Sequence, residues 1–526
     1  MENIVFFGFM YVYLEKAKYT VMREYEVLMN PNPLVKYLRK PAREFTRYDI
    51  IRFIEENGIE QVNFHYVGED GKLKTLNFVV TSRHYLESIF ATGERVDGSS
   101  LFTFIEAGTS DLYVIPRFRT AFVNPFSEVP TLDLLCSYYT KDGKPLESAP
   151  EHILRKAHER FKKKTGYKIK ALGELEYYVI APAEANEQFP NTDQKGYHAS
   201  MPFAKFEQLR VEAMRLIAQC GGKIKYAHSE VGNFTTNHHY YEQHEIEFNP
   251  VDIEDAADQL LIAKWILRNL AYKYGVNISF APKISQGKAG SGLHIHYMIA
   301  DQHDDNLMVG PDGNLSVVAL KSIAGLLMHA KSLTAFGNTI PLSYLRLVPN
   351  QEAPTRICWG ETNRSALIRV PLGWTKKTQM IRDANPYETA EVPYIPGKQT
   401  VEFRVPDGSA DVYHLLAAMV MAIEDGFEHK DALKVAKDLH VEVDIFKPEN
   451  DHIKNRLESL PRSCEESADY LEADRTVYER DGVFPKGTID RFINQLRAYK
   501  DRDLSERLYG KPQQIIELVQ QYLHYM

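Results

Sequence analysis

The sequence predicts an α+β protein with two domains, and three observations support this prediction. The 526 residues suffice for more than one domain, and 44% hydrophobic with 25% charged residues is ordinary for a globular protein. Strand-like runs dominate residues 61–139, whereas helical and strand-like segments alternate after Pro150. A turn at Asp142–Pro145 separates the two regions. We therefore place one domain at residues 46–147 and a larger one, with a helical C-terminal tail, at 148–526.

The elements of each region follow from local patterns. An amphipathic helix at Tyr48–Ile54 begins the first domain, and apolar runs between turn residues predict the strands 61–66, 76–80, 112–115, 121–123 and 132–139. In the second domain, periodic apolar residues predict the helices 151–164, 203–219 and 253–274. Residues 1–45 are assigned to an N-terminal extension. The apolar-periodic segment Ile515–Leu523 could dock on a neighbour.

Charge and cysteine content exclude several classes of protein. The formal net charge is -8, and no long Lys/Arg cluster is present, so neither nucleic acid nor an anionic membrane is expected as a partner. The four cysteines are widely spaced without a CxxC, which argues against a disulfide framework and a zinc knuckle.

The apolar stretch Ile4–Leu14 is too short to cross a bilayer. We expect a soluble, cytoplasmic protein.

Four strand-like runs each carry a polar or charged pair two residues apart. In a β-strand, residues i and i+2 share a face, so each pair points away from its apolar neighbours. Facing charges toward a core is unfavourable unless they are paired or bind metal. The pattern therefore predicts one wall of a divalent-metal site, with the pairs Glu174 and Glu176, Glu245 and Glu247, His294 and His296, and Glu402 and Arg404.

The candidate metal ligands are five carboxylates and one imidazole from separate segments: Glu174, Glu176, Glu230, Glu245, His294 and Glu402. Hard cations prefer oxygen ligands, so this set suits Mg²⁺ or Mn²⁺ better than zinc. For any single glutamate, a solvated strand edge is an equally good explanation, whereas the whole set favours metal. His296 and Glu247 are weaker candidates, since each can be a satisfied or solvent-facing partner.

Four arginines in the second half of the chain lie beside apolar or turn residues: Arg346, Arg364, Arg369 and Arg404. A guanidinium group binds carboxylate or phosphate oxygens in a bidentate fork, which suits an anionic substrate with a transferring phosphoryl group. Structural ion pairing with the abundant acidic residues is the alternative. The chain has no Walker-type or kinase-type Gly-rich loop, so a nucleotide would bind in another architecture.

Seven segments, in order, resemble the signature blocks of glutamine synthetase in its bacterial class I form: Val96–Ser100, Gly173–Tyr178, Gln243–Phe248, Gly290–His294, Arg346–Pro354, Asn363–Pro371 and Glu402–Asp407. The resemblance spans roughly residues 46–500. It implies an N-terminal β-grasp domain and a larger catalytic domain with a curved antiparallel sheet and surrounding helices, the glutamine synthetase/guanido kinase-like fold. It also implies a homo-oligomeric ring, with a dodecamer as a candidate, and active sites between subunits.

The resemblance assigns roles to the candidate residues. One metal would be bound by Glu176, Glu230 and Glu245, and the other by Glu174, His294 and Glu402. The carboxylates of glutamate would be held by Arg346 and Arg404, with Gly292 against the substrate backbone. Arg364 and Arg369 would contact the γ-phosphate of ATP, and Arg369 would also contact the substrate. His296 would contact the nucleotide.

The implied reaction converts L-glutamate, ammonia and ATP into L-glutamine, ADP and phosphate through γ-glutamyl phosphate. By resemblance, Tyr197, Glu230 and Asp97 of a neighbouring subunit would bind ammonium, with Asp97 as proton acceptor. Glu352 would close the site against water. Without the resemblance, a simple Asp-Gly turn would be the preferred explanation of Asp97. The alternatives are a γ-glutamyl-amine ligase and a non-catalytic regulatory relative that binds glutamine or nucleotide.

The chain also departs from the family pattern. Residues 231–244, between Glu230 and Glu245, are longer than the usual link, and we expect a surface loop there; an extra metal at His238 and His239 is the less favoured alternative. Where many members have a serine and an arginine near the nucleotide, this chain has Met298 and Thr400. The adenylylation loop is missing, and Tyr509–Met526 replaces the usual C-terminal ending, which puts the stacking of two rings in doubt.

Overall fold

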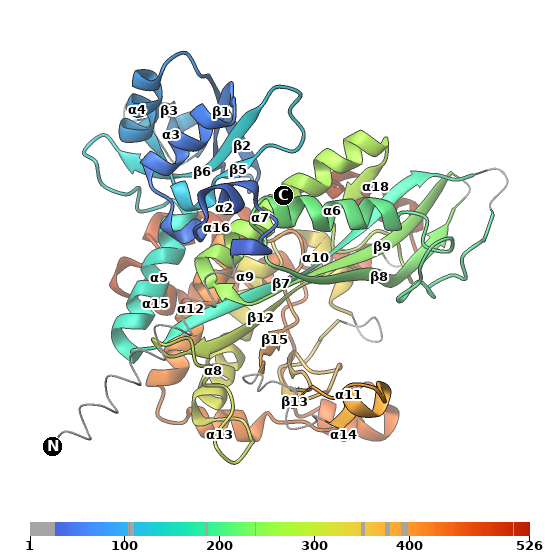
Figure 1. Ribbon diagram of the computed structural model, residues 1–526. Helices are drawn as coiled ribbons and strands as arrows, with labels where there is room; N and C mark the ends of the chain where they lie inside the picture. The colour runs from blue at the N-terminus through green and yellow to red at the C-terminus, as the bar shows by residue number, and fades with distance from the viewer. Residues whose placement is uncertain are drawn as a thin grey trace. The chain divides into compact units, whose positions relative to one another are not determined.

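The computed structural model describes residues 27–103, 105, 110–184, 188–236, 238–348, 353–373, 379–390, 398–508 and 510–526. The chain divides into two compact units (Figure 1). The first contains residues 1–146 together with 212–222, and the second contains residues 147–211 and 223–526. Each unit has its own sheet and its own buried core.

The first unit is built on a mixed six-stranded sheet in the order β2-β1-β6-β4-β3, with β5 also paired to β6. Only β1 and β6 run parallel, and the other neighbouring strands are antiparallel. All five predicted strands are confirmed, with shifts at their ends. The strands are β1 Gln61–Val67, β2 Leu73–Val79, β3 Glu94–Asp97, β4 Asp111–Pro116, β5 Phe122–Val123 and β6 Thr131–Thr140.

Three α-helices accompany this sheet: α2 Pro33–Leu38, α3 Arg47–Glu56 and α4 Arg83–Thr92. The predicted helix at Tyr48–Ile54 is α3, which begins at a capping box in which Thr46 and Asp49 bond each other's backbone N–H groups. Ser82 caps α4 in a similar way. Aromatic packing joins helix and sheet, because the ring of Phe64 lies 4.8 Å from that of Phe78 and 6.2 Å from that of Phe90 on α4.

The second unit is built on a nine-stranded sheet in the order β13-β14-β15-β12-β7-β9-β8, with β10 and β11 also paired to β7. All neighbours are antiparallel except β13 and β14. The strands are β7 Lys168–Pro182, β8 Ile224–Thr235, β9 His239–Phe248, β10 Val251–Asp252, β11 Asn277–Ser279, β12 Leu293–Ala300, β13 Trp359–Glu361, β14 Ile368–Val370 and β15 Val401–Phe403.

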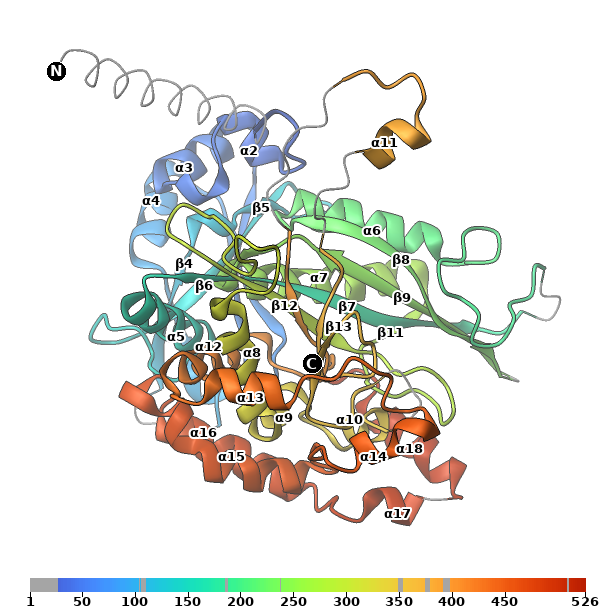
Figure 2. The same ribbon diagram turned by 90° about the horizontal axis from the view of Figure 1, so that it is seen from below.

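Helices cover this sheet, and Figure 2 shows α5, α8, α9, α12, α15 and α16 gathered on one side of β7 and β12. Helix α12 is buried along most of its length and contacts α5, α7, α8, α9 and α15. The helices of this unit are α5 Pro150–Thr165, α7 Ile253–Tyr274, α8 Val317–Met328, α9 Ala330–Gly337, α10 Pro341–Arg346, α11 Gln379–Ala384, α12 Val412–Glu428, α13 Ala432–Asp438, α14 Asp451–Lys454, α15 Cys464–Tyr478, α16 Lys486–Ala498, α17 Leu504–Leu508 and α18 Pro512–Tyr522. Helix α6 Glu207–Gln219 begins in the second unit and ends in the segment 212–222 of the first.

The predicted helix at 203–219 begins later than expected, at Glu207. The backbone N–H groups of Lys205 and Phe206 donate to the carboxylate of Glu242, at 2.8 and 3.0 Å. A tertiary contact therefore satisfies these donors, so a further helical turn is not needed to satisfy them. The predicted helices at 151–164 and 253–274 are confirmed as α5 and α7.

The prediction of a surface loop at 231–244 is wrong, because most of this segment forms the antiparallel hairpin of β8 and β9. The rings of Phe234 and Tyr241 stack at 4.4 Å across the two strands. They also belong to a hydrophobic cluster that includes Ile515, Val519 and Tyr522 of the C-terminal segment. Aromatic cross-strand packing thus turns the longer link into an extension of the sheet, and α18 packs on its own chain.

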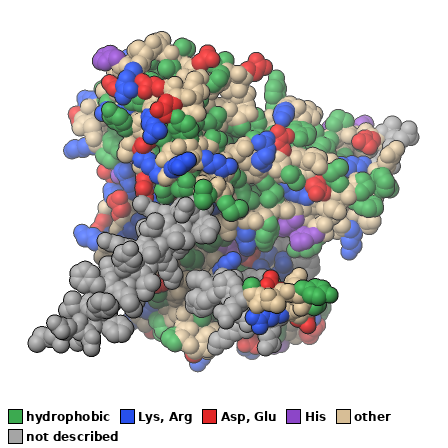
Figure 3. All heavy atoms as spheres, viewed as in Figure 1, with side chains coloured by type: hydrophobic (Ala, Val, Ile, Leu, Met, Phe, Trp, Pro, Cys, Tyr) green, Lys and Arg blue, Asp and Glu red, His purple; other side chains and the backbone are tan. Residues whose placement is uncertain are grey.

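On the face seen in Figure 3, basic and acidic side chains are interspersed. Among the described residues, no single helix has the length and apolarity needed to cross a bilayer, and α8 and α9 pass that test only as a pair bent by 75°. Most residues of both helices are buried.

Candidate metal centre and substrate site

Four neighbouring strands bring the predicted polar pairs onto one wall of the second unit. Strand β7 lies between β9 and β12, and β15 follows β12. Glu174 is therefore in register with Glu247 on one side and with His294 on the other. Further registers join Glu176 with Glu245, His296 with Glu402, and Arg369 with Glu402. The i,i+2 spacing and the strand order together place these side chains on the same face of the sheet.

One group of ligand atoms is formed by Glu174, His294 and Glu402, which the resemblance assigns to a single metal. The Nδ1 atom of His294 lies 3.0 Å from Oε2 of Glu174 and 3.5 Å from Oε1 of Glu402. One ligand atom from each residue lies within 4.8 Å of the others. This spacing allows the three side chains to share one cation.

The second expected group is only partly assembled. Glu230 and Glu245 lie together with His228, whose ring nitrogens are 3.7 and 3.3 Å from their carboxylates. Glu176 is not in this group of ligand atoms: its Oε2 accepts hydrogen bonds from the Gln243 side chain at 3.1 Å and from the Gly292 N–H at 2.8 Å. Sequence reasoning missed His228, although its i,i+2 spacing from Glu230 is the same signal that identified the other pairs.

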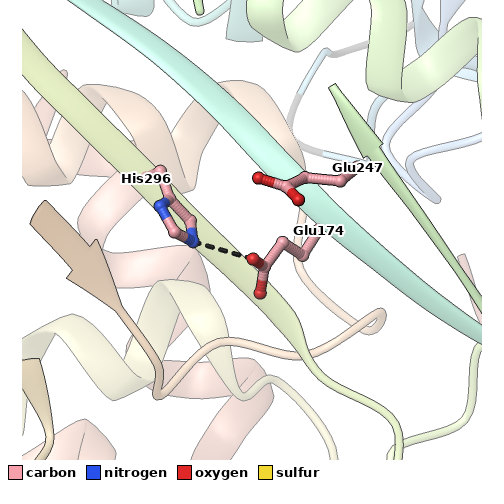
Figure 4. Close-up of side chains that lie close together, drawn as sticks. All are labelled: Glu174, Glu247 and His296. Atoms are coloured by element: carbon pink, nitrogen blue, oxygen red, sulfur yellow. Dashed lines mark ion pairs between the residues drawn. The ribbon is translucent and has the colours of Figure 1, made fainter. Parts of the chain in front are cut away.

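A third group joins Glu174 and His296 with Glu247 (Figure 4). The Nε2 atom of His296 lies 2.9 Å from Oε1 of Glu174. His296 and Glu247 are both buried, so the alternative that either one faces solvent is wrong. The Nδ1 atom of His296 lies 3.0 Å from the Thr400 hydroxyl, which fixes the orientation of the ring.

The electrostatics of these groups suit a bound cation. Burial and the nearby carboxylates of Glu174 and Glu176 raise the pKa of Glu245 well above its usual range. Burial would also raise the pKa of Glu174, but His296 and His294 lower it. Acidic oxygens thus outnumber the positive partners around Glu245. Carboxylate oxygens and imidazole nitrogens are donors that Mg²⁺ and Mn²⁺ accept, so these residues fit a divalent metal.

Two of the predicted arginines lie buried beside these ligands. Arg346 is 3% exposed, donates from Nη1 to the Val405 carbonyl at 2.9 Å, and places Nη2 3.2 Å from Nε2 of His294. Burial lowers the pKa of Arg346. A Cβ atom at Gly292 would lie 2.6 Å from Arg346 Nη2 and from His294 Nε2, so a side chain at this position would force one of these two groups to shift. Arg404 donates from Nε to Oε1 of Glu402 at 3.0 Å.

The other two predicted arginines differ in position. Arg369 donates from Nη1 to Oε2 of Glu402 at 2.9 Å, so its side chain belongs to the same wall. Arg364 has an exposed side chain, and its carbonyl accepts a hydrogen bond from Arg404. The structure therefore joins Arg369, but not the side chain of Arg364, to the carboxylates.

The predicted ammonium residues lie in different parts of the chain. Tyr197 is exposed and stacks on His198, with 4.2 Å between the ring centroids, and His198 in turn lies 4.3 Å from His228. Asp97 lies at the end of β3 in the first unit and accepts hydrogen bonds from the hydroxyl groups of Ser99 and Ser100, both at 2.7 Å. These bonds, with one from Ser110, keep the pKa of Asp97 well below its usual range. Glu352 lies outside the described residues.

The positions that depart from the family pattern are resolved in part. Thr400 is buried against His296, and Met298 is half-buried on β12. His238 and His239 are both exposed. Neither histidine belongs to a metal-binding group within the part of the chain that the structure describes.

Comparison with known proteins identifies the family. The glutamine synthetase catalytic domain matches residues 147–506, and the glutamine synthetase β-grasp domain matches residues 58–141. The chain belongs to the glutamine synthetase family. It is 31% identical to the glutamine synthetase of Thermotoga maritima over 445 residues, which cover 83% of this chain and 93% of that protein. It is 29% identical to a 3-hydroxylaminophenol mutase of Cupriavidus pinatubonensis over 476 residues, covering 85% and 94%.

Solved structures agree on the fold. The glutamine synthetase of Plasmodium falciparum superposes with a TM-score of 0.70 at 20% identity, covering 89% of this chain and 97% of that one. A structure named apo GmaS without ligand gives 0.68 at 22% identity, covering 87% and 96%. The expected fold, a β-grasp domain followed by a catalytic domain with a curved sheet and helices, is confirmed. Glutamine synthetases use ATP and divalent metals, in keeping with the ligand groups above.

Proposed function

We propose that this glutamine synthetase family member joins ammonia to L-glutamate, using ATP and giving L-glutamine, ADP and phosphate. The observation that carries the proposal is the contiguous arrangement of Glu174, His294, Glu402 and Arg346 on one wall. Two kinds of equipment meet there: ligands for hard cations, and a buried guanidinium for a carboxylate. A reaction that transfers a phosphoryl group to a carboxylate needs both.

The side chains have separate tasks in this proposal. One divalent ion would be held by Glu176, Glu230 and Glu245, and the other by Glu174, His294 and Glu402. When bound, such ions neutralise charge on phosphoryl oxygens. Glutamate would be oriented by Arg346 and Arg404, with its backbone against Gly292. At the nucleotide, the proposed contacts are His296, Arg364 and Arg369.

The chemistry proceeds in two steps. A γ-carboxylate oxygen of glutamate attacks the terminal phosphorus of ATP, ADP leaves, and γ-glutamyl phosphate forms. Ammonia then attacks the acyl carbon, and phosphate leaves. Ammonium must first lose a proton, and we assign the role of proton acceptor to Asp97 of a neighbouring subunit. Tyr197 and Glu230 would bind the ammonium ion. The low pKa of Asp97 keeps its carboxylate ionised, which favours binding of ammonium. Glu352 is the proposed closing residue that excludes water.

The assignment of Asp97 to a neighbouring subunit implies a homo-oligomeric ring, with a dodecamer as the candidate. Asp97 is exposed at the end of β3, as a contribution to another subunit requires. Mass measurement of the assembled protein tests this point. A monomer with full activity would contradict the shared site.

A γ-glutamyl-amine ligase is the second candidate. The rings of Tyr197, His198 and His228 form a cluster, and the His228 ring lies beside Glu230 and Glu245. Such rings suit an alkyl ammonium group as well as ammonium. The similarity to a 3-hydroxylaminophenol mutase also shows that relatives of this chain include other named activities.

The deciding experiment supplies the assembled protein with ATP, glutamate and either ammonium or small primary amines. Phosphate release and product mass are measured. We expect ammonium to be the preferred acceptor, and Asp97→Asn to lose most of the ammonium-dependent release. Asp111→Asn is the matched control, since Asp111 pairs with Asp97 in register and is exposed as well. Turnover with amines alone would favour the amine ligase, and a lack of ATP binding in calorimetry would favour a non-catalytic relative.

A further inference from the structure

Helix α18, Pro512–Tyr522, follows residue 506, where the match to the catalytic domain ends. Nevertheless it packs tightly on the second unit. Ile515, Val519 and Tyr522 are buried in one hydrophobic cluster, whereas Ile516 is 50% exposed. The buried residues follow the i, i+4, i+7 spacing of a single helix face. The helix therefore docks through a defined apolar face.

This face contacts α10, which carries one of the substrate-site arginines. Ile340, just before α10, and Leu342 within it are fully buried in the same cluster as the α18 residues. Figure 2 shows α18 next to α10, and the two helices are in contact. Arg346 is the last residue of α10. Because a close-packed helix cannot shift without loss of contacts, α18 helps to fix the position of Arg346.

The same face also contacts the loop 281–292, which leads to Gly292. Ala281 and Ile284 of this loop belong to the cluster. The loop closes on itself, since the N–H group of Ser291 donates to the Pro282 carbonyl at 3.0 Å. Holding the start of the loop against α18 therefore also holds its end.

Polar contacts fasten the residues that follow α18. The Ser279 hydroxyl donates to the Leu523 carbonyl at 2.6 Å and accepts from the Ala281 N–H at 3.2 Å. One buried hydroxyl thus joins the C-terminal segment to the beginning of the loop. The Arg268 side chain donates to the main-chain oxygen of Met526. These bonds give the docked segment a defined position as well as an apolar contact.

The loop and α10 meet at Arg346. A Cβ atom at Gly290 would lie 2.9 Å from Cγ of Arg346, so the loop backbone packs directly on this side chain. We propose that α18 is a positioning element that holds α10 and the loop together and thereby keeps Arg346 and Gly292 in the geometry that binds glutamate. The identity of this ligand rests on the proposed function. A guanidinium that is already held in place loses less conformational freedom on binding, so docked α18 increases the affinity for glutamate.

The test compares two adjacent isoleucines of α18 in the full-length, assembled protein. Ile515→Ala shortens a buried side chain of the cluster, and Ile516→Ala makes the same change at an exposed position. Hydrogen–deuterium exchange is followed over residues 281–292 and 340–346, and KM is measured for glutamate and for ATP. We expect Ile515→Ala to exchange faster in both segments and to raise KM for glutamate roughly 10-fold, because misplacement of a distant group has effects of this order.

The pattern across variants separates positioning from general damage. KM for ATP should not change, Ile516→Ala should behave as the wild type does, and Ile515→Val should recover most of the loss. Wild-type exchange in both segments of Ile515→Ala would overturn the proposal. An unchanged KM for glutamate despite faster exchange would overturn it as well.

A second variant covers the case in which Ile515→Ala does not fold. Ser279→Ala removes only the hydroxyl that binds Leu523, and we expect a rise in KM for glutamate of roughly 2–10-fold, as the loss of one hydrogen bond causes. Unchanged exchange and KM in Ser279→Ala would then reject the positioning role. Faster exchange in the variants of a protein that releases no phosphate with glutamate and ammonium would reject only the proposed function, since exchange reports the held geometry of Arg346 without turnover.

Discussion

Glu174 and His294 lie directly opposite each other on β7 and β12, and Nδ1 of His294 is 3.0 Å from Oε2 of Glu174. The same ring is 3.5 Å from Glu402 on β15. The imidazole therefore lies between two carboxylates, one from each of the strands that neighbour β12. Arg346 approaches its other nitrogen at 3.2 Å, so His294 also separates the carboxylates from the guanidinium.

The first prediction concerns this histidine. We expect His294→Asn to weaken Mn²⁺ binding at its site and to lower ATP-dependent phosphate release by at least about 100-fold, since a ligand is lost and two carboxylates are left close together. Metal titration and phosphate release measure the two effects. His303→Asn, at an exposed position, is the control. Normal metal affinity in His294→Asn would show that the ring only pairs with Glu174.

The second prediction concerns the guanidinium of Arg346. Arg346→Lys keeps the charge but loses the planar fork that donates to the Val405 and Arg404 carbonyls. We expect KM for glutamate to rise roughly 10–100-fold, because one or two hydrogen bonds to a charged group are lost. The change in kcat should be smaller. Steady-state kinetics test this. Arg356→Lys serves as control, because Arg356 bonds Leu457 and Ser459 away from the site; an unaltered KM in Arg346→Lys would contradict a grip on glutamate.

The spacing of polar residues predicted the wall of the site, because the i,i+2 rule depends only on strand geometry. It could not predict which pairs meet. Glu174 contacts both His294 and His296 because β12 lies next to β7 in a particular register, and that register is a property of the whole sheet. The i,i+2 pattern also does not decide whether the Glu247 side chain is buried or faces solvent. Its burial follows from the central position of β9 between β7 and β8.

Two sequence expectations failed because tertiary contacts decided the local structure. The segment after Glu230 was expected as a loop, although Phe234 and Tyr241 are residues typical of strands and stack across the hairpin. The helix expected from residue 203 begins at Glu207, because Glu242 binds the preceding N–H groups from another strand. The hydrogen bonds to Glu242 cannot be predicted from the local pattern of apolar residues at 203–219, and the pairing of Phe234 with Tyr241 depends on the register of the hairpin.

The third prediction is a pH dependence of stability centred on His329. Burial alone lowers the pKa of His329, but hydrogen bonds to Asp425 and Asp474 raise it to about 9. The folded pKa exceeds the ordinary value of 6.5, so the stabilisation is fully present below pH 6.5 and is lost as the pH rises through 9. The loss is on the order of 3 kcal/mol in the free energy of unfolding.

Denaturant unfolding at pH 6.5 and at pH 9 measures this loss. We expect the wild type to lose more stability between the two values than His329→Gln, which has no proton to release. His452→Gln, at an exposed position, should behave as the wild type does. Parallel losses in wild type and His329→Gln would mean that other groups cause the pH dependence.

The fourth prediction concerns the close approach of α8 and α12 at Gly325. A Cβ atom there would lie 2.2 Å from the Ala422 carbonyl oxygen, so the helices would have to move apart. We expect Gly325→Ala to lower the free energy of unfolding by about 1–3 kcal/mol, although alanine is the better helix former. Gly487→Ala in α16 is the matched control: nothing lies within 4 Å of its Cβ position, so a gain of up to about 1 kcal/mol is expected. Thermal unfolding of both variants decides between steric contact and propensity, because propensity alone would stabilise both.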